Sequence, residues 1–238
     1  PESGVLHIFG ELNNTSRQSG SESYWLLFPL INATLRDADG IVIDSYMTRP
    51  SLSRVITIQI PPSVAAPFDL RVGKEAAART HNYSLVADCP WAYNALSGGS
   101  RFADTPAKKL EILNITDSKN ALGWLEIAGE IENRGYEPIT GLMTILGTFY
   151  DANGRVVYVA EAEYWLGEKA PISPGATLDF TLTVESAERT NSIARYKIMA
   201  ESWTSRYELY STVPELSWPT VSLCLVFATA VLALGRKR

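Results

Sequence analysis

One pattern of residues occurs twice in the sequence, and this repeat constrains the fold more than any other feature. The pair Gly10-Glu11 returns as Gly129-Glu130, 119 positions later. The spacing is 114 at a repeated Asp-x-x-Gly turn, 112 at a Phe and 113 at a Tyr. The change falls in residues 15–23, a polar stretch where a longer surface loop is tolerated. An ordered series at nearly constant spacing predicts two tandem copies of one domain. The further matches are residues 28–31 with 137–140, 35–43 with 149–157, 61–70 with 173–182, and 83–88 with 196–201.

Each copy has the residue pattern of β-strands. Residues 177–184 alternate apolar and polar side chains, and residues 139–150 form a long run rich in Thr, Ile and aromatics. The Asn-Gly pair within residues 151–154 favours a hairpin turn. Residues 74–79 and 185–190 have room for one helical turn each. The sequence therefore predicts an all-β fold of two tandem antiparallel β-sandwich domains, Ig-like in architecture.

The C-terminal segment has the character of a membrane anchor. Residues 216–235 carry no charged side chain, and as a helix these 20 residues span roughly 30 Å, the thickness of a hydrocarbon core. Arg236, Lys237 and Arg238 follow, and such cations mark the cytoplasmic side. We therefore expect one transmembrane helix in the cell membrane, a cytoplasmic C-terminus and an extracellular ectodomain. An exported chain needs a signal peptide, so we expect one to have been removed before Pro1.

The repeat and the apolar segment together divide the chain. Residues 96–108 contain a Ser-Gly-Gly-Ser run without apolar periodicity, which is typical of a linker. The predicted parts are a first sandwich domain (1–95), the linker (96–108), a second sandwich domain (109–205), a stalk with a Pro-Glu motif (206–215), the transmembrane helix (216–235) and the basic end (236–238).

The composition is that of a folded protein, with 46% hydrophobic and 20% charged residues. Without the three terminal cations the ectodomain keeps 18 Lys and Arg against 26 Asp and Glu, a net charge near −8. This acidity argues against nucleic acid or anionic lipid as a partner. Cys224 lies in the predicted span, so we expect no disulfide with Cys89. For Cys89 we expect a buried apolar role, with an intermolecular bridge or a reactive thiol as the alternative.

Five Asn-x-Ser/Thr sequons lie in the predicted ectodomain and are candidate N-glycosylation sites. They are Asn13, Asn14, Asn32, Asn82 and Asn114. Because Asn13 and Asn14 are adjacent, we expect at most one of them to carry a glycan. The number of sequons suits a glycosylated surface protein.

The sequence predicts no catalytic site, metal site or cofactor. His7 and His81 have no metal-ligating neighbour at helical or strand spacing, and no Ser-His-Asp context, phosphate loop or Cys-x-x-Cys pair occurs. Residues 37–40 resemble the start of a calcium loop but lack its Glu at the twelfth position. A hairpin turn explains the same position of the second copy, so calcium is the minor alternative.

Tryptophan and tyrosine gather at several places in the chain. An exposed group of these residues would suit contact with a glycan, a solute or a protein. The candidates are Trp25, Trp91, Tyr93 and Trp165. The alternative is that they pack in the sandwich cores and between the domains.

The second copy, over about residues 108–204, resembles the FxLYD-type domains, small β-sandwich modules of bacterial and archaeal envelope proteins. The first copy, over about residues 5–90, looks like a more divergent member. The resemblance implies a surface, adhesive or scaffolding role without a fixed catalytic residue. It is carried by Gly129-Glu130-Ile131-Glu132-Asn133, Phe149-Tyr150-Asp151, Asn153-Gly154, Val156-Val157 and Ser173-Pro174-Gly175.

The C-terminal segment also resembles an archaeal sorting signal of the PEF type. Pro214, Glu215 and the basic end match this signal, while Leu216 stands where Phe is usual. The resemblance implies processing by an archaeosortase-like enzyme, which replaces the helix by a lipid anchor. An ordinary permanent anchor is the equal alternative.

These observations predict a non-catalytic, membrane-anchored surface protein of archaeal type with a structural or interaction role. It would form part of an envelope layer or filament, or serve as an accessory subunit of a membrane complex. Its partners would be other envelope proteins or further copies of itself, met through the sheet edges. The alternative function is an extracytoplasmic module that binds a solute or glycan, and an enzyme is the third class.

Overall fold

β-Strands make up most of this chain in the computed structural model, which describes residues 4–16, 24–50, 59–60, 64–89, 91–94, 110–167, 170–202 and 211–212. The first half contains β1 (Leu6–Asn13), β2 (Tyr24–Leu27), β3 (Leu30–Arg36), β4 (Val42–Thr48), β5 (Gln59–Ile60), β6 (Ala65–Val72), α1 (Lys74–Arg79), β7 (Asn82–Asp88) and β8 (Trp91–Asn94). The second half contains β9 (Leu110–Lys119), β10 (Leu125–Asn133), β11 (Gly141–Tyr150), β12 (Val156–Leu166), β13 (Thr177–Val184), α2 (Ala187–Ser192), β14 (Arg195–Ser202) and β15 (Ser211–Thr212).

The predicted linker, the Pro-Glu motif, the transmembrane helix and the basic end lie outside the described residues. In the part of the chain that is described, no helix is long and apolar enough to cross a membrane.

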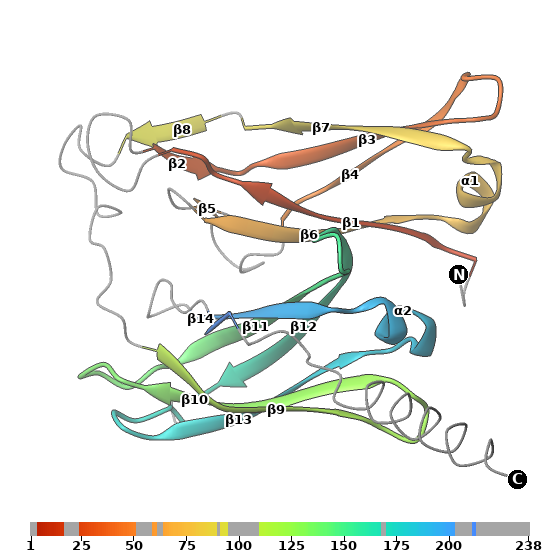
Figure 1. Ribbon diagram of the computed structural model, residues 1–238. Coiled ribbons are helices and arrows are strands. Elements are labelled where there is room, and N and C mark those ends of the chain that lie inside the picture. The colour runs from red at the N-terminus through yellow and green to blue at the C-terminus, as the bar shows by residue number, and fades with distance from the viewer. Residues whose placement is uncertain are drawn as a thin grey trace, which may run out of the picture.

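The sheets stack in layers, as Figure 1 shows from top to bottom. Sheet β4-β3-β7 lies outermost, and β1-β6 lies beneath it. Sheet β12-β11-β14-β15 follows, and β13-β10-β9 closes the other side. A small sheet, β5-β2-β8, completes the first half. The strand pairs are antiparallel, and each half has a buried apolar cluster between its sheets, so the architecture is a β-sandwich.

The two halves repeat the same pairings, which gives the sequence repeat a structural meaning. β1 pairs with β6 so that Gly10 lies opposite Phe68, and β10 pairs with β13 so that Gly129 lies opposite Phe180. A methyl carbon added to Gly10 would stand 2.5 Å from the Phe68 ring. The same carbon at Gly129 would stand 2.9 Å from the Phe180 ring. Only glycine fits, because the phenyl ring rests on the backbone at that position.

The hairpins and short helices also correspond. β3–β4 and β11–β12 each carry a register shift beside the turn, and α1 and α2 lie at the same end of their halves in Figure 1. Ile31 lies opposite Thr48 in one hairpin as Ile145 lies opposite Ala162 in the other. The predicted match of residues 28–31 with 137–140 is therefore wrong, because the shared proline occupies different places in the two copies.

The turns between the hairpin strands bind their own backbone. The Oδ1 atom of Asp37 accepts from the N–H groups of Asp39 and Ile41, at 3.0 and 2.9 Å. Asp151 Oδ1 accepts from residues 153 and 155 in the same way, and this donation lowers the pKa of the Asp151 carboxyl. These bonds account for both aspartates as turn residues. Among the described residues, no group of three or more His, Cys, Asp or Glu side chains could hold a metal ion.

A buried asparagine joins the sheets at the same place in each half. Asn14 Nδ2 donates to the carbonyl oxygens of Tyr24 and Ile60, at 2.7 and 2.8 Å. Asn133 Nδ2 donates to those of Glu137 and Ile172, both at 2.8 Å. Each Oδ1 accepts a backbone N–H two residues on. In each half, one asparagine side chain thus links the end of β1 or β10 to two segments that follow it in the sequence.

Candidate interaction surface

The inner layers of the two halves meet in a mixed aromatic and charged contact. Phe9 on β1 lies 5.4 Å from Tyr158 on β12, measured between ring centroids. The Arg189 guanidinium stands 4.7 Å above the Phe9 ring while its Nη1 donates to the Val157 carbonyl oxygen at 2.9 Å. A cation held over an aromatic face at this distance is attracted by the ring.

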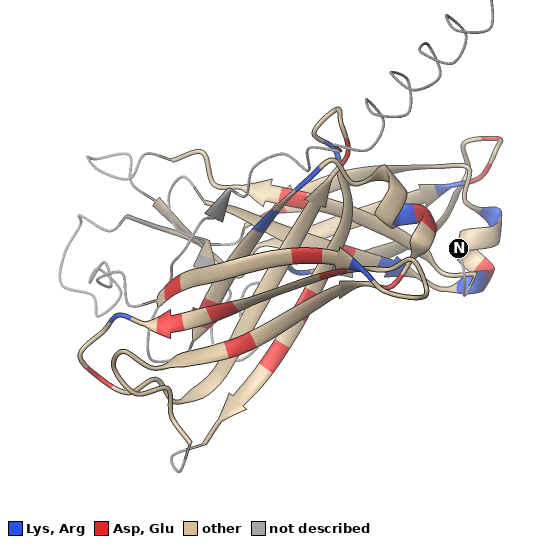
Figure 2. Ribbon diagram, turned by 60° about the horizontal axis from the view of Figure 1, so that its bottom comes forward, with Lys and Arg blue, Asp and Glu red and all other residues tan. Residues whose placement is uncertain are grey.

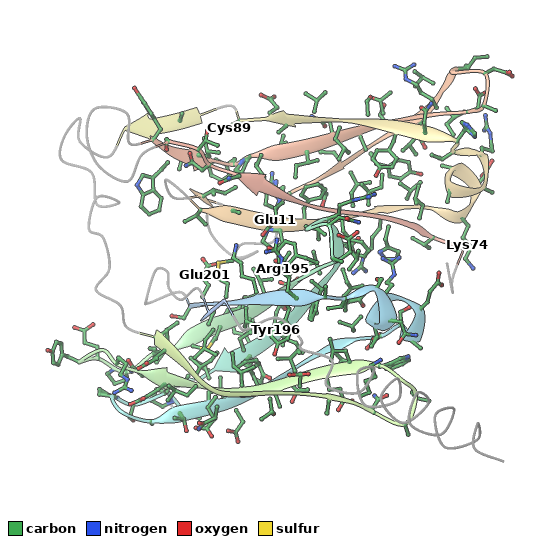
Figure 3. All side chains as sticks on the ribbon, viewed as in Figure 1. Glu11, Lys74, Cys89, Arg195, Tyr196 and Glu201 are labelled. Atoms are coloured by element: carbon green, nitrogen blue, oxygen red, sulfur yellow. The ribbon has the colours of Figure 1, made fainter. Side chains whose placement is uncertain are left out.

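Glu11 forms the polar centre of the same contact and lies between the halves in Figure 3. The Tyr150 hydroxyl donates to its carboxylate at 2.8 Å, and the Lys197 ammonium lies 3.4 Å away. Burial, together with this hydrogen bond, raises the pKa of Tyr150 above its ordinary range. Leu146 and Met199 add an apolar cluster with residues of the first half. This contact joins the two halves of the chain.

The histidines form no catalytic pair or metal site in the part of the chain that the structure describes. His7 Nδ1 lies 3.0 Å from Asp69 Oδ1, and Arg71 Nε lies 2.8 Å from the other oxygen of that carboxylate. His81 is exposed, and its backbone N–H donates to the carbonyl oxygen of Arg36.

The predicted aromatic group divides into residues in different surroundings. Trp25 is 8% exposed and lies opposite Tyr93 across β2 and β8, so it cannot serve as a surface contact. Trp165 is 76% exposed at the end of β12 in the second half. The side chains of Trp91 and Tyr93 are outside the described set.

The sequons differ in the same way. Asn13, Asn82 and Asn114 are exposed, Asn32 is half-buried on β3, and Asn114 Nδ2 donates to Glu130 at 3.2 Å. Asn14 is buried and both Nδ2 hydrogens are used by carbonyl oxygens. The prediction of Asn14 as a candidate glycosylation site is therefore wrong, because a glycan on Nδ2 would break the hydrogen bonds to the Tyr24 and Ile60 carbonyl oxygens. Cys89 is half-buried rather than buried, and its Sγ lies 3.5 Å from the Leu27 carbonyl oxygen.

The outer face of the β13-β10-β9 sheet is acidic. Figure 2 shows red Asp and Glu positions along the strands that this view brings forward. Arg134 bridges Glu111 and Glu132 at 2.6 and 2.9 Å, and Asn114 contacts Glu130. A face of this sign repels nucleic acid and anionic lipid.

The strand β7 is the clearest departure from the repeat, because all its residues are exposed. Tyr83 and Leu85 are 48% and 40% exposed, whereas their counterparts Tyr196 and Ile198 on β14 are 3% and 0% exposed. Val86, on the opposite face of β7, is also exposed. A strand with apolar side chains uncovered on both faces is a candidate contact surface.

The cause lies in the strand that covers β14. β9 pairs with β10, and its Leu110 and Ile112 belong to the same buried cluster as Tyr196 and Ile198. In the first half, the described part of the chain offers β1 one neighbour, β6, and no counterpart of β9. The open face is our name for two features together: the edge of β1 that no described strand pairs with, and Tyr83, Leu85 and Ala87 of β7.

The alternating pattern of β7 is typical of a strand that covers a core. One feature of the sequence bears on its exposure. The second copy is preceded by the strand pattern of residues 110–119, and the first copy has no described equivalent.

Stacked antiparallel sheets with separate cores define this chain as a β-sandwich protein. No known protein family matches the chain, and no curated protein matches it either. Among solved structures it is similar to a transglutaminase of red sea bream, at 11% identity and a TM-score of 0.24 over 83% of this chain and 26% of that one.

Two glycosidases give likenesses of the same order. The exo-chitosanase CsxA of Amycolatopsis orientalis has 10% identity and a TM-score of 0.29, over 87% of this chain and 26% of that one. A beta-glucuronidase of glycoside hydrolase family 2 has 11% identity and a TM-score of 0.26, over 83% of this chain and 22% of that one. The chain thus spans about a quarter of the length of these enzymes. Likenesses this slight say nothing about what the chain does.

Proposed function

We propose that this protein is a non-catalytic cell-surface protein whose tandem Ig-like domains have a structural or interaction role. The open face is the single observation that carries the proposal. It combines a strand edge that has no neighbour among the described strands with uncovered apolar side chains, the two features through which sheet proteins join other chains. An envelope layer, a filament or an accessory position in a membrane complex would use such a surface. Other envelope proteins or further copies would be the partners, and no cofactor would be needed.

The cellular setting of the proposal rests on the sequence. Residues 216–235 would form the anchor in the cell membrane, Arg236 to Arg238 would stay in the cytoplasm, and the domains would face outward with glycans at exposed sequons. The resemblances to FxLYD-type domains and to the PEF sorting signal favour an archaeal envelope. They also leave an archaeosortase-like enzyme as a processing partner.

Intact-mass measurement of the native protein from its own membranes tests this setting. A chain that ends at Arg238 would be a permanent transmembrane subunit, and one that ends near Pro214 or Glu215 with an added lipid would be a sorted surface protein. Recovery of the whole protein from the aqueous fraction, without a lipid, would overturn the proposal.

Trp165 keeps the second candidate function open. Its indole is exposed, whereas Trp25, the other predicted aromatic residue with a described side chain, is buried, and Tyr136 is exposed in the same half as Trp165. An exposed indole suits stacking on a sugar ring. Oligosaccharides that quench tryptophan fluorescence in the wild type but not in Trp165→Ala would support glycan binding, while equal quenching in both proteins would rule out this site.

A further inference from the structure

We propose that Asn32 carries an N-linked glycan that lies on the outer face of the β4-β3-β7 sheet and covers Met47 and Val86. The acceptor sequence is Asn32-Ala33-Thr34. The inference rests on the proposed cell-surface role, because such glycans are attached to exported chains. It deepens that role by naming one modified residue and the side chains that its glycan contacts.

The Asn32 side chain points away from the core of the first half. Its neighbours Ile31 and Ala33 are 2% and 0% exposed and belong to the buried cluster, so alternation along β3 places Asn32 on the opposite face. This sheet is the outermost layer of the first half in Figure 1. No hydrogen bond of the Asn32 amide occurs among the described residues, whereas both Nδ2 hydrogens of Asn14 are bound. The Nδ2 atom of Asn32 is therefore available to a sugar.

Two exposed apolar side chains flank Asn32 on this face. Met47 on β4 and Val86 on β7 lie directly opposite Asn32 in the two antiparallel pairings. They are 64% and 60% exposed. Directly opposed residues of neighbouring strands hold their Cβ atoms about 4.5–5.5 Å apart. A sugar attached to Asn32 therefore stands between the two side chains, and its C–H groups remove apolar surface of both from water.

The next row of residues on the same face carries hydroxyl groups. Thr34 on β3 lies opposite Ser45 on β4 and Ser84 on β7. Both serines are exposed, and each hydroxyl can donate and accept a hydrogen bond. The surface around Asn32 thus combines an apolar row with a hydroxyl row. This combination suits a sugar ring, which has C–H groups on its faces and hydroxyl groups around its edge.

The second half shows the equivalent row covered by protein. Leu146 on β11 holds the place of Asn32, and Met199 on β14 holds the place of Val86. Leu146 and Met199 are 1% and 5% exposed, because they pack in a cluster with residues of the first half. Among the described residues, Met47 and Val86 have no comparable cover. A glycan on Asn32 would supply one from the centre of the row.

The attachment forms one bond and breaks another. The anomeric carbon of an oligosaccharide leaves the phosphate of a lipid-linked donor and joins the Nδ2 atom of Asn32. The amide gives up one proton, which the lipid phosphate takes as it departs. The host cell supplies the lipid-linked oligosaccharide and the transferase, so this chain contributes the acceptor alone.

Mass spectrometry of tryptic peptides tests the site on the full chain isolated from its own membranes. Trypsin cleaves after Arg17 and Arg36, and Asn32 is the one sequon asparagine within residues 18–36. We expect this peptide to carry the mass of a glycan. A peptide of residues 18–36 without added mass would overturn the inference, whatever the other sequons carry.

Two substitutions at Thr34 form a matched pair. Thr34→Ala destroys the sequon and should remove one glycan from the intact mass, whereas Thr34→Ser preserves the sequon and should keep that glycan. Asn32→Gln is a second variant without the sequon and should lose the same mass. An intact mass that falls by no glycan in Thr34→Ala would overturn the inference.

Oxidation of Met47 tests the contact as well as the attachment. Hydrogen peroxide transfers one oxygen atom to the thioether sulfur and leaves water, and exposed methionines react most readily. We expect Met47 to oxidise severalfold faster in Thr34→Ala than in Thr34→Ser, because the glycan shields it. Met143 is 0% exposed and should react equally slowly in both variants. Equal rates at Met47 would overturn the contact between glycan and side chain.

The outcomes separate the inference from the proposed function. A membrane-anchored protein with bare Asn32 would keep the proposed function and lose the glycan site. A glycan on Asn32 of a protein released without an anchor would keep the site and remove the anchored role. A native dimer with bare Asn32 that Val86→Lys converts to monomer would overturn the inference, because a second copy would then cover the row.

Discussion

Asn14 and Asn133 each join separate segments of the chain through the hydrogen bonds of one side chain. Both amides are buried, and each donates hydrogen bonds to two carbonyl oxygens. A buried carbonyl oxygen without a donor costs about 1–3 kcal/mol of stability. The two asparagines are therefore structural residues of the fold.

Replacement of either asparagine by alanine should be costly. We expect Asn133→Ala and Asn14→Ala each to lower the free energy of unfolding by about 1–3 kcal/mol, because each removes two buried hydrogen bonds to carbonyl oxygens. Urea denaturation measures the loss. Asn13→Ala, at the exposed neighbour, is the control and should stay within about 0.5 kcal/mol of the wild type. Equal effects at Asn13 and Asn14 would contradict this reading of the buried bonds.

Tyr196 predicts how stability changes in alkali. Burial raises its pKa to about 12, from an ordinary value of 10.0, and the nearby Asp117 charge adds to the shift. The unfolded chain loses this proton at a lower pH than the folded one, so the folded state binds more protons between these values. The free energy of unfolding should therefore fall as pH rises from about 10 to about 12.

Chemical denaturation across this range checks the slope. Tyr196→Phe cannot titrate, so its stability should fall less steeply than that of the wild type between about pH 10 and about pH 12. Identical slopes in the two proteins would show that Tyr196 does not contribute. Tyr150, whose pKa is also raised, supplies part of the remaining slope.

At the scale of strands and turns, Gly129 sets how closely β10 approaches its neighbours. We expect Gly129→Ala to destabilise the protein by about 1–3 kcal/mol, because the added carbon meets the Phe180 ring and the Leu113 carbonyl oxygen. Thermal unfolding of the double variant Gly129→Ala with Phe180→Leu provides the test. The second change removes the ring contact, so part of the loss should return. A double variant that is as unstable as the sum of the two changes would contradict the ring contact.

Many of the strands, turns and short helices could be predicted from the sequence. The hairpin turn at residues 151–154, the helical turn of α1 and the alternating core side of β13 follow local rules, and the structure agrees with each. Such features depend on neighbouring residues, which the sequence displays directly.

The features that the sequence does not show depend on distant parts of the chain. The exposure of β7 does not follow from its alternating pattern, because periodicity does not show which other strands pack against a strand. Asn14 reads as a sequon in Asn-Thr-Ser, although carbonyl oxygens from Tyr24 and Ile60 determine its role. The proline shared by residues 29 and 138 also misaligned the copies, because loops of unequal length precede it.

For the whole molecule, the contact between the halves determines whether they act as one body. β11 is buried on both faces over most of its length, one face toward its own core and the other toward the first half. Leu146, on the second of these faces, belongs to a cluster with Ile60 and Ala66. This shared cluster should make the two halves unfold together.

The substitution Leu146→Asp tests this coupling. It buries a charge between the halves, and we expect one thermal transition in calorimetry to become two, with a larger radius of gyration in X-ray scattering. Asn32→Asp is the matched control, because Asn32 holds the equivalent place on β3 at a solvent-facing position. Its transition should remain single. Two transitions in the wild type would mean that the contact does not couple the halves.

The outer surface of β3 has a consequence for how such a chain can grow. It presents Asn32, Thr34 and Arg36 where β11 presents Leu146, Thr148 and Tyr150. The two outer faces are therefore not equivalent, since an amide stands at the centre of one and a buried leucine at the centre of the other, although the exposed Met47 and Val86 flank Asn32. In repeat arrays, an end unit with a polar outer face stops the stack. The first copy has this character only at its central strand, so a third copy placed before it would pack on β3 less closely than the first copy packs on β11.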